Sequence, residues 1–395
     1  MSQLNNGEKL SSESEGYQVI IVGAGPVGLS LALMLALKNY RVLVLEKEVG
    51  TAKHSRAPAI WPRTQEILAD LGVMDRFTER GILKPSLEIY DVDRDTCLFR
   101  APLESLSDQT RFPWLLIIPQ ARTESLLLEA LEQQSSATIR FSSEVTELDQ
   151  RDGCVEVHFT APAGESVASG DILVGCDGAH SFVRHAIGAH QEGLTYAMQA
   201  ALADVRISDS TALHSPRLTT TPGIAVGIRI EADTWRLILP FAKSDSISLE
   251  RRVEEAVENL FHRSDWEPVW RSEFRLHRRI SSVFSRGRVV LAGDAAHLNS
   301  PVGGQGMNAG IQDASRLAPA IEQALRSNPE ETLQAYGDSR RAQIAQGVNR
   351  VTDIMTRVLL AKQGRFIRLA LSGANLALRV PGLRKKMLRR MAMLD

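Results

Sequence analysis

The chain has 395 residues, long enough for a large hydrophobic core and for two or more domains. Its 44% hydrophobic and 24% charged residues are ordinary for a globular protein in water, and its formal net charge of −1 excludes a whole-molecule basic field for nucleic acid. Three widely separated cysteines, Cys97, Cys154 and Cys176, form no CxxC pair. The sequence therefore indicates neither a zinc site nor a disulfide framework, and it favours a reducing cytoplasm.

The N-terminal residues 1–16 are polar and contain no apolar stretch. They predict a disordered leader rather than a signal peptide. The longest apolar run, from Val27 to Leu37, is too short to cross a bilayer. The folded part is expected to begin near residue 17.

A strand, a glycine-rich turn and a helix are expected next. The apolar run VIIV indicates a strand buried on both faces, and Gly23, Gly25 and Gly28 follow it directly as GxGxxG. In this pattern Gly23 permits a tight turn, Gly25 lets backbone N–H groups approach a pyrophosphate, and Gly28 lets helix and strand pack closely. The positive end of the helix adds attraction for the phosphates. The stretch therefore predicts a dinucleotide site.

The second strand, RVLVLE, ends in an acidic residue. Glu46 is placed to accept hydrogen bonds from a ribose diol, and an acid here favours an unphosphorylated ribose, as in FAD or NAD. We include Pro26 and Val27, at the start of the helix, and Lys47 among the expected cofactor contacts. The motif alone does not distinguish the two dinucleotides.

Two further glycine-containing segments follow apolar strands. DILVGCDGAHSFVR, residues 171–184, places Asp177 and Gly178 at the end of one strand. GDAAHLNSPVGGQGMNAG, residues 293–310, follows the strand RVVL and precedes a helical segment, IQDASRLAPAIEQAL. Five glycines in the latter segment indicate that a ligand lies close to the main chain.

The three segments in this order resemble the single-component FAD-dependent aromatic-ring hydroxylases, typified by para-hydroxybenzoate hydroxylase. The family's second motif, DGxxSxxR, is matched by Asp177, Gly178, Ser181 and Arg184. Its third, GDAAHxxxPxxGQGMNxGxxDA, is matched at every specified position between residues 293 and 314. The resemblance covers most of residues 17–355 and implies non-covalent FAD as the cofactor.

By this resemblance the third segment holds the flavin. Asp294 is expected to bond the ribityl chain, and Pro301 to lie beside the isoalloxazine ring. A helix N-terminus suits the N1/O2 edge, which is anionic in reduced flavin. Further contacts are expected from the backbone at Gly293, Gly304, Gly306, Met307 and Asn308. His297 and Asp313 are interpreted as anchors of the loop rather than as catalytic groups.

Earlier segments supply the remaining expected contacts. The resemblance implies that Asp177 contacts FAD and that Arg184 takes part in docking NAD(P)H. Arg56 matches the family's cofactor-contacting arginine, and Gln120 and Arg122 are candidates for the ribityl contact. For each of these three, the alternative is a surface side chain beside a helix start.

Between Gly188 and Arg279 the pattern changes to short apolar runs. TPGIAVGIRIEADTWRLILPF predicts an antiparallel hairpin, and SLEIYDVDRDTCLFR has the same character. The resemblance implies that these pieces form one sheet over the flavin and bind the substrate. Trp235, Leu237 and Tyr196 are candidate substrate contacts, although the face that carries the first two is equally typical of a core.

Residues 361–395 contain nine Lys or Arg and one acidic residue. A basic amphipathic helix of this kind can lie on an anionic membrane. We favour the other interpretation, a C-terminal helical cap whose basic face is solvated.

The expected fold class is α/β, an FAD-binding Rossmann-like domain with an interleaved antiparallel β-sheet substrate domain and C-terminal helices. The expected FAD-binding domain comprises residues 17–85, 101–187 and 280–355. The substrate domain comprises 86–100 and 188–279, and the C-terminal helices lie within 356–395.

The resemblance implies an NAD(P)H-dependent flavoprotein monooxygenase. Reduced FAD would react with O2 to form a C4a-hydroperoxyflavin, which hydroxylates a phenolic or polycyclic aromatic molecule. The flavin carries the chemistry, so no catalytic side chain and no metal are predicted. The alternatives are a ubiquinone-ring hydroxylase or prenyl reductase of the same fold and, less favoured, a non-catalytic flavin-binding protein. The sequence leaves open the substrate, the choice of NADH or NADPH, and whether the chain is a monomer or a homodimer.

Overall fold

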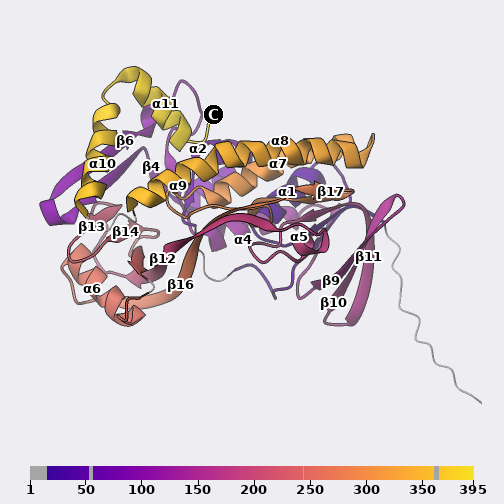
Figure 1. Cartoon of the computed structure of the whole chain (residues 1–395), viewed down its shortest axis with the longest axis horizontal. Helices are drawn as coiled ribbons and strands as arrows, with labels where there is room; N and C mark the ends of the chain where they lie inside the picture. Colours follow the sequence, from indigo (N-terminus) through magenta and orange to yellow (C-terminus); the bar gives the residue numbers. More distant parts are fainter. Residues whose placement is uncertain (1–15, 53–56, 243, 360–363) are drawn as a thin grey trace, which may run out of the picture.

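The computed structural model describes residues 16–52, 57–242, 244–359 and 364–395, and Figure 1 shows its arrangement. The helices are α1 Pro26–Ala36, α2 Pro62–Asp70, α3 Met74–Arg80, α4 Gln120–Leu131, α5 Phe182–Ala186, α6 Leu249–Phe261, α7 Gly306–Ala324, α8 Pro329–Gln346, α9 Val348–Leu359, α10 Gly364–Ala377 and α11 Pro381–Met391. Three short 3-10 helices are η1 Val92–Arg94, η2 Leu103–Leu106 and η3 Gly293–Ala295.

The strands form three sheets. They are β1 Tyr17–Val22, β2 Val42–Leu45, β3 Ala59–Ile60, β4 Ile82–Lys84, β5 Ser86–Asp91, β6 Thr96–Pro102, β7 Leu115–Ile117, β8 Ala137–Arg140, β9 Glu144–Arg151, β10 Cys154–Ala161, β11 Gly164–Gly175, β12 Gln191–Arg206, β13 Arg217–Thr219, β14 Ala225–Arg229, β15 Thr234–Ala242, β16 Glu267–Ser281, β17 Ser285–Arg286, β18 Val289–Leu291 and β19 His297–Leu298.

The first sheet is built on parallel strands in the order β18, β11, β1, β2 and β8. Helices α1, α4 and α7 pack on one face, where leucines of all three helices share a core with β1 and β2. The antiparallel strands β9 and β10 and helix α5 cover the other face. A strand covered on both faces must be apolar throughout, which explains the continuous runs VIIV and VLVL.

The second sheet has the order β19, β16, β12, β15, β14, β13, β5 and β6. Its neighbours are antiparallel except for β13 and β5. The long strands β12 and β16 run from the first sheet into this one, and α6 packs on one face of it (Figure 1). A small third sheet has the order β3, β7 and β4, and the β5–β6 hairpin of the second sheet lies between β4 and β7 in sequence.

The C-terminal helices contact both the first and the second sheet. Helices α7 and α8 lie side by side along the first sheet, and α9 continues toward the second (Figure 1). Helix α10 then covers β6, the edge strand of the second sheet, and α11 follows it. Within the described ranges, no helix combines the length and apolar character that crossing a membrane requires.

The predicted fold class and the predicted hairpin of β14 and β15 are confirmed. The domain bounds stay a prediction, as does a cytoplasmic location, although all three cysteines are free. The predicted leader lies outside the described residues except for Gly16.

Candidate active site

The turn between β1 and α1 needs two of its three glycines for its own packing. Gly23 has φ +106°, and a Cβ built on it would lie 2.4 Å from the carbonyl oxygen of Cys176. A Cβ on Gly28 would lie 2.0 Å from the oxygen of Gly23. Gly25 differs, because no described atom lies within 4 Å of a Cβ built there. The space beside Gly25 is therefore open to a ligand that approaches the main chain.

The start of α1 is arranged for an anion. Gly25 is the N-cap and provides no side-chain hydrogen bond, Pro26 has no N–H, and the first turn carries no acidic residue. Orphan N–H groups of a helix start bind phosphate well when no side chain caps them. At the end of β2, Glu46 accepts hydrogen bonds from the N–H groups of Ala24 (2.7 Å) and Glu48 (3.0 Å), which fixes its carboxylate beside this turn.

The third motif packs directly on the first. Gly293, at φ +61°, begins η3 directly after β18, and its Cβ would lie 2.8 Å from Cγ2 of Val27. A Cβ on Gly310 in α7 would lie 2.5 Å from the same methyl group. Two glycines thus make room for one valine of α1. The β1–α1 turn and the β18–α7 segment consequently form a single surface.

A buried carboxylate holds the β18–α7 segment in place. Asp313 accepts hydrogen bonds from the Gly293 N–H (2.9 Å) and from Arg340 Nε (2.7 Å), and it contacts His297 Nε2 at 2.7 Å. Burial opposes its ionisation, but the charges and hydrogen bonds of His297 and Arg340 prevail and hold the pKa of Asp313 at about 2. Asp313 and His297 therefore hold the β18–α7 segment in place, as loop anchors do. Arg340 of α8 belongs to the same buried cluster, which the sequence did not indicate.

The start of α7 is also open to a ligand. Its N-cap, Gln305, makes no side-chain capping bond, and no described atom lies within 4 Å of a Cβ built on Gly306. The side chain of Asn308 is fully buried, accepting from the Trp61 N–H (2.9 Å) and donating to the Ala59 oxygen (2.9 Å). Asn308 thus fixes α7 against β3 and leaves only its backbone for a cofactor.

The other predicted contacts of this segment differ in their exposure. Asp294 and Pro301 are exposed, whereas Gly304 and Met307 are half-buried. Trp61 donates from Nε1 to the oxygen of Gly303 at 3.0 Å, which ties the loop after Pro301 to the start of α2.

The second motif contacts the third motif through Arg184. Asp177 accepts a hydrogen bond from the Val183 N–H (3.0 Å) at the start of α5, and burial raises the pKa of this carboxyl. Arg184 is only 2% exposed, and it donates to the carbonyl oxygens of Ala295 and Ala179 at 3.0 Å each. Its guanidinium links the second motif to η3, so in this conformation it offers no surface on which NAD(P)H could dock.

Helix α4 approaches the loop after β2. Gln120 begins the helix and donates to Glu124 Oε1 at 2.8 Å, and Glu124 accepts from the Ala52 N–H at 2.9 Å. Burial raises the pKa of Glu124. Arg122 is exposed, as is Lys47 after β2. Arg56, the remaining predicted contact, lies outside the described residues.

The candidate substrate residues are placed differently from one another. Trp235 and Leu237 are fully buried in the core between β15 and α6, and Trp235 Nε1 donates to Ser210 Oγ at 2.8 Å. Neither side chain has an exposed surface that a ligand could contact, so we no longer propose Trp235 and Leu237 as substrate contacts. Tyr196 is half-buried at a bulge of β12 and donates to Asp353 Oδ1 at 2.6 Å. Burial and this hydrogen bond raise the pKa of Tyr196 to about 12.

Asp353 makes a junction that the sequence did not reveal. Besides Tyr196, it pairs with Arg278 Nη1 at 3.1 Å and with Arg357 Nε at 3.0 Å. It thereby connects α9 to both long strands, β12 and β16. The neighbours of Asp353 on α9 contact the loop that precedes α7. Thr356 forms a hydrogen bond with Ser300, and Met355 lies 3.2 Å from a Cβ built on Gly303.

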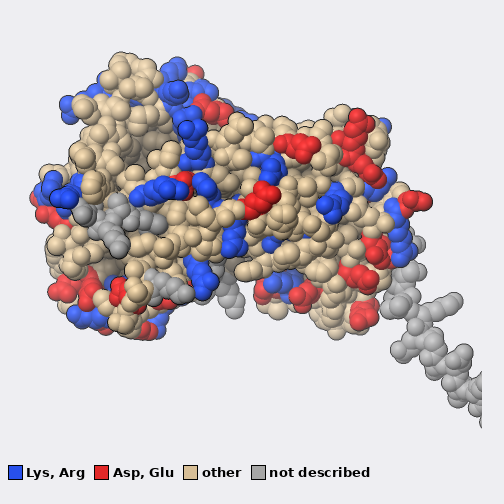
Figure 2. Space-filling view, viewed as in Figure 1, with Lys and Arg blue, Asp and Glu red and all other residues tan. Residues whose placement is uncertain are grey.

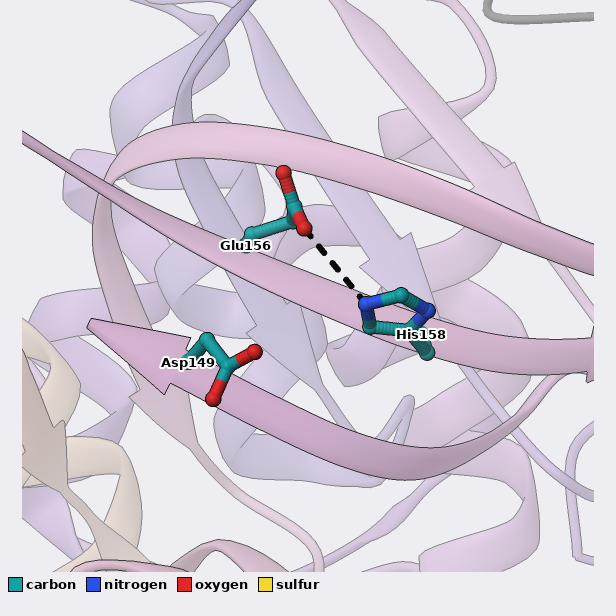
Figure 3. A group of neighbouring side chains, drawn as sticks. All are labelled: Asp149, Glu156 and His158. Atoms are coloured by element: carbon teal, nitrogen blue, oxygen red, sulfur yellow. Dashed lines mark ion pairs between the residues drawn. The ribbon is translucent and has the colours of Figure 1, made fainter. Parts of the chain in front are cut away.

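One cluster elsewhere has the residue types of a metal site. Figure 3 shows Asp149 on β9 with Glu156 and His158 on β10, and their ligand atoms lie within 4.8 Å of one another. Glu156 Oε1 is already 2.7 Å from Arg151 Nη2, and Asp149 is exposed. A cation would have to displace the arginine, so we assign no metal to this cluster.

Comparison with known proteins agrees with this geometry. A family described as an FAD binding domain matches residues 16–351. Para-nitrophenol 4-monooxygenase of Pseudomonas sp. strain WBC-3 is 30% identical over 334 residues, which is 82% of either chain. The chain belongs to the FAD-dependent aromatic-ring hydroxylases.

The crystal structure of p-nitrophenol 4-monooxygenase from Pseudomonas putida DLL-E4 superposes with a TM-score of 0.87 at 25% identity. The superposition covers 95% of this chain and 98% of that one. A 12-dehydrotetracycline 5-monooxygenase/anhydrotetracycline 6-monooxygenase of Streptomyces rimosus is 33% identical over 359 residues, 85% of this hydroxylase and 68% of the relative.

This hydroxylase is accordingly a flavoprotein monooxygenase with FAD as its cofactor and NAD(P)H as its reductant. The structure fits the cofactor on independent grounds. Gly25 and Gly306 stand at uncapped helix starts with open space beside them, although no packing contact among the described residues requires glycine there. A dinucleotide whose phosphates and flavin edge lie against main chain would require it.

Proposed function

We propose that this monooxygenase hydroxylates a single-ring phenol. The observation that carries the proposal is the superposition with p-nitrophenol 4-monooxygenase, which reaches a TM-score of 0.87. An anhydrotetracycline hydroxylase from Streptomyces rimosus superposes less well, with a TM-score of 0.79. The better agreement in fold favours the substrate class of the nitrophenol enzyme.

We propose that the substrate lies between the second sheet and the opening at α7. The odd-numbered residues of β12 and β15 face α6, as Ala203 and Leu237 do. The opposite face carries the half-buried Ile228 and Ile238, together with the buried ion pair of Arg236 with Asp204 at 2.7 Å. Ile228 packs against the cluster that contains Trp61 and Ala309, so this face is turned toward β3 and α7. A flat apolar ring would be held there, away from water.

In this proposal the residues of the chain position the cofactor and the substrate. Bound FAD, once reduced by NAD(P)H, supplies the activated oxygen that is transferred to the ring. The uncapped start of α7 stabilises negative charge at the flavin edge, and the Asp313 anchor keeps that start beside the β1–α1 turn. Ile228 and Ile238 on the sheet face help to exclude water from the reacting oxygen.

The substrate proposal is tested by aerobic NAD(P)H consumption with the FAD-loaded enzyme. We expect a para-substituted phenol to stimulate consumption strongly and to yield a hydroxylated product in matching amount. Tetracyclic phenols serve as the matched comparison. Stimulation and product with the tetracyclic compounds alone would show that the site takes polycyclic substrates and would overturn the proposal.

Asp294 is proposed to bond the ribityl chain of FAD. Because a hydrogen bond to a charged group contributes about 1.5–3 kcal/mol, Asp294→Ala is expected to weaken FAD binding by about 10- to 100-fold. The side chain is exposed, so thermal unfolding of the apo-protein is expected to change much less than FAD affinity. FAD titration of the apo-protein measures the effect, with Asp294→Asn as a variant that keeps a polar group. Unaltered affinity in Asp294→Ala would remove the assignment.

A further inference from the structure

More than half of the large apolar side chains exposed in the described residues belong to α9, α10 and α11 or the turns between them. On α10 and the turn into α11 they recur at intervals of three, four or seven residues. We call this set the apolar stripe: Phe366 (50% exposed), Leu369 (69%), Leu376 (63%), Val380 (50%) and Leu383 (50%). This spacing places Phe366, Leu369 and Leu376 along one side of α10, and Val380 and Leu383 follow in the turn and at the start of α11.

The stripe faces outward because the opposite side of α10 is fixed on the protein. Ile367 is 2% exposed, and Leu371 and Ala374 pack against the core beneath. Arg368 pairs with Asp91 at 2.7 Å, and Asn375 Oδ1 accepts from the Arg100 N–H of the edge strand β6 at 3.2 Å. These contacts set the rotation of the helix. The outward direction of the stripe is therefore a property of the fold.

Basic side chains surround the outer end of the stripe. Residues 379–386, RVPGLRKK, are all exposed, and they include Arg379, Arg384 and Lys386. Between residues 364 and 394 there is no acidic residue, and Asp395 is paired with Arg389 at 2.9 Å. Figure 2 shows Lys and Arg side chains, with a few acidic ones among them, beside uncharged surface over α10 and α11 at the upper left.

We propose that the apolar stripe and its basic border bind the surface of an anionic membrane. Lys385 is paired with Asp108 at 3.2 Å, whereas no ion pair is found for Arg379, Arg384 or Lys386 in the described residues. Apolar side chains flanked by an excess of cations match the interface between acyl chains and anionic head groups. A second copy of the chain would bring two sets of like charges together, which opposes pairing through this face. The membrane contact does not depend on which ring the enzyme hydroxylates.

The test is co-sedimentation of the FAD-loaded enzyme with vesicles. Phosphatidylcholine vesicles are compared with vesicles that also contain phosphatidylglycerol. We expect binding to the anionic vesicles, weakened by salt. The triple variant Arg379→Ser/Arg384→Ser/Lys386→Ser is expected to bind about 100-fold more weakly, since each basic residue near an anionic surface contributes roughly a fivefold factor. Leu376→Ser/Val380→Ser/Leu383→Ser is expected to lose at least about tenfold.

Val49→Ser/Val167→Ser/Val269→Ser is the matched control, because these side chains are also exposed (85%, 42% and 45%) but lie elsewhere. It is expected to bind vesicles as the unaltered enzyme does. All variants should retain FAD, which shows that they are folded. Absence of binding to anionic vesicles overturns the proposal. So does a dimer in solution that dissociates in the Leu376, Val380 and Leu383 variant, since a second copy would then cover the stripe.

Discussion

Gly25→Val is expected to lower FAD affinity by roughly 100-fold, or about 3 kcal/mol, with little change in the stability of the apo-protein. The reason is that no described atom lies within 4 Å of a Cβ at this position, so the protein tolerates a side chain there. The side chain would instead occupy the space through which a pyrophosphate reaches the start of α1. FAD titration and thermal unfolding of the apo-protein measure the two effects separately.

Two other glycines provide controls for this result. Gly28→Ala would place its Cβ 2.0 Å from the Gly23 oxygen, so it is expected to destabilise the fold itself by about 3 kcal/mol. Gly373→Val on the surface of α10, where a Cβ also meets nothing within 4 Å, is expected to change neither property. If Gly25→Val bound FAD as the unaltered protein does, the phosphate site would lie elsewhere.

Asp313→Asn is expected to destabilise the protein by about 3 kcal/mol and to weaken FAD binding. The carboxylate is fully buried and joins Gly293, His297 and Arg340, so its replacement leaves a buried arginine without its partner. Denaturant unfolding measures the loss. Asp338→Asn, an exposed carboxylate on α8, is the matched control and should have no effect. The double variant Asp313→Asn/Arg340→Met should lose less than the sum of the two single variants.

The same carboxylate predicts a pH dependence. Its pKa is about 2 in the folded protein, below the usual value of 3.8 for an aspartate. The unfolded state therefore binds a proton more readily, and the stabilisation is fully present above about pH 4. It amounts to roughly 2.5 kcal/mol and is lost as the pH falls from about 4 toward 2. Asp313→Asn should lack this part of the acid dependence, and an unchanged acid limb would contradict it.

Local patterns predicted the parts of the site that depend on neighbouring residues. The strand β1, the GxGxxG turn, β2 with Glu46, and the β14–β15 hairpin are set by runs of a few residues and lie where expected. Helix α7 begins at Gly306, five residues before the apolar periodicity, because the glycines that open it carry no hydrophobic signal.

The remainder depends on contacts between distant residues. Asp313 pairs with Arg340, 27 positions later, and Tyr196 pairs with Asp353, 157 positions later. No spacing rule predicts such pairs. The alternation on β15 separated two faces correctly, but only the position of α6 shows that Trp235 and Leu237 belong to the core rather than to a ligand face. Arg184 illustrates the same limit, because its carbonyl partners lie in separate motifs.

The most direct test of the monooxygenase assignment is turnover under labelled dioxygen with a para-substituted phenol that stimulates NAD(P)H consumption. We expect the product to carry one oxygen atom from dioxygen, with one NAD(P)H consumed for each product formed. The protein should be yellow and should lose this activity when FAD is removed. Product oxygen that comes only from water, or turnover by a colourless protein without FAD, would contradict the account.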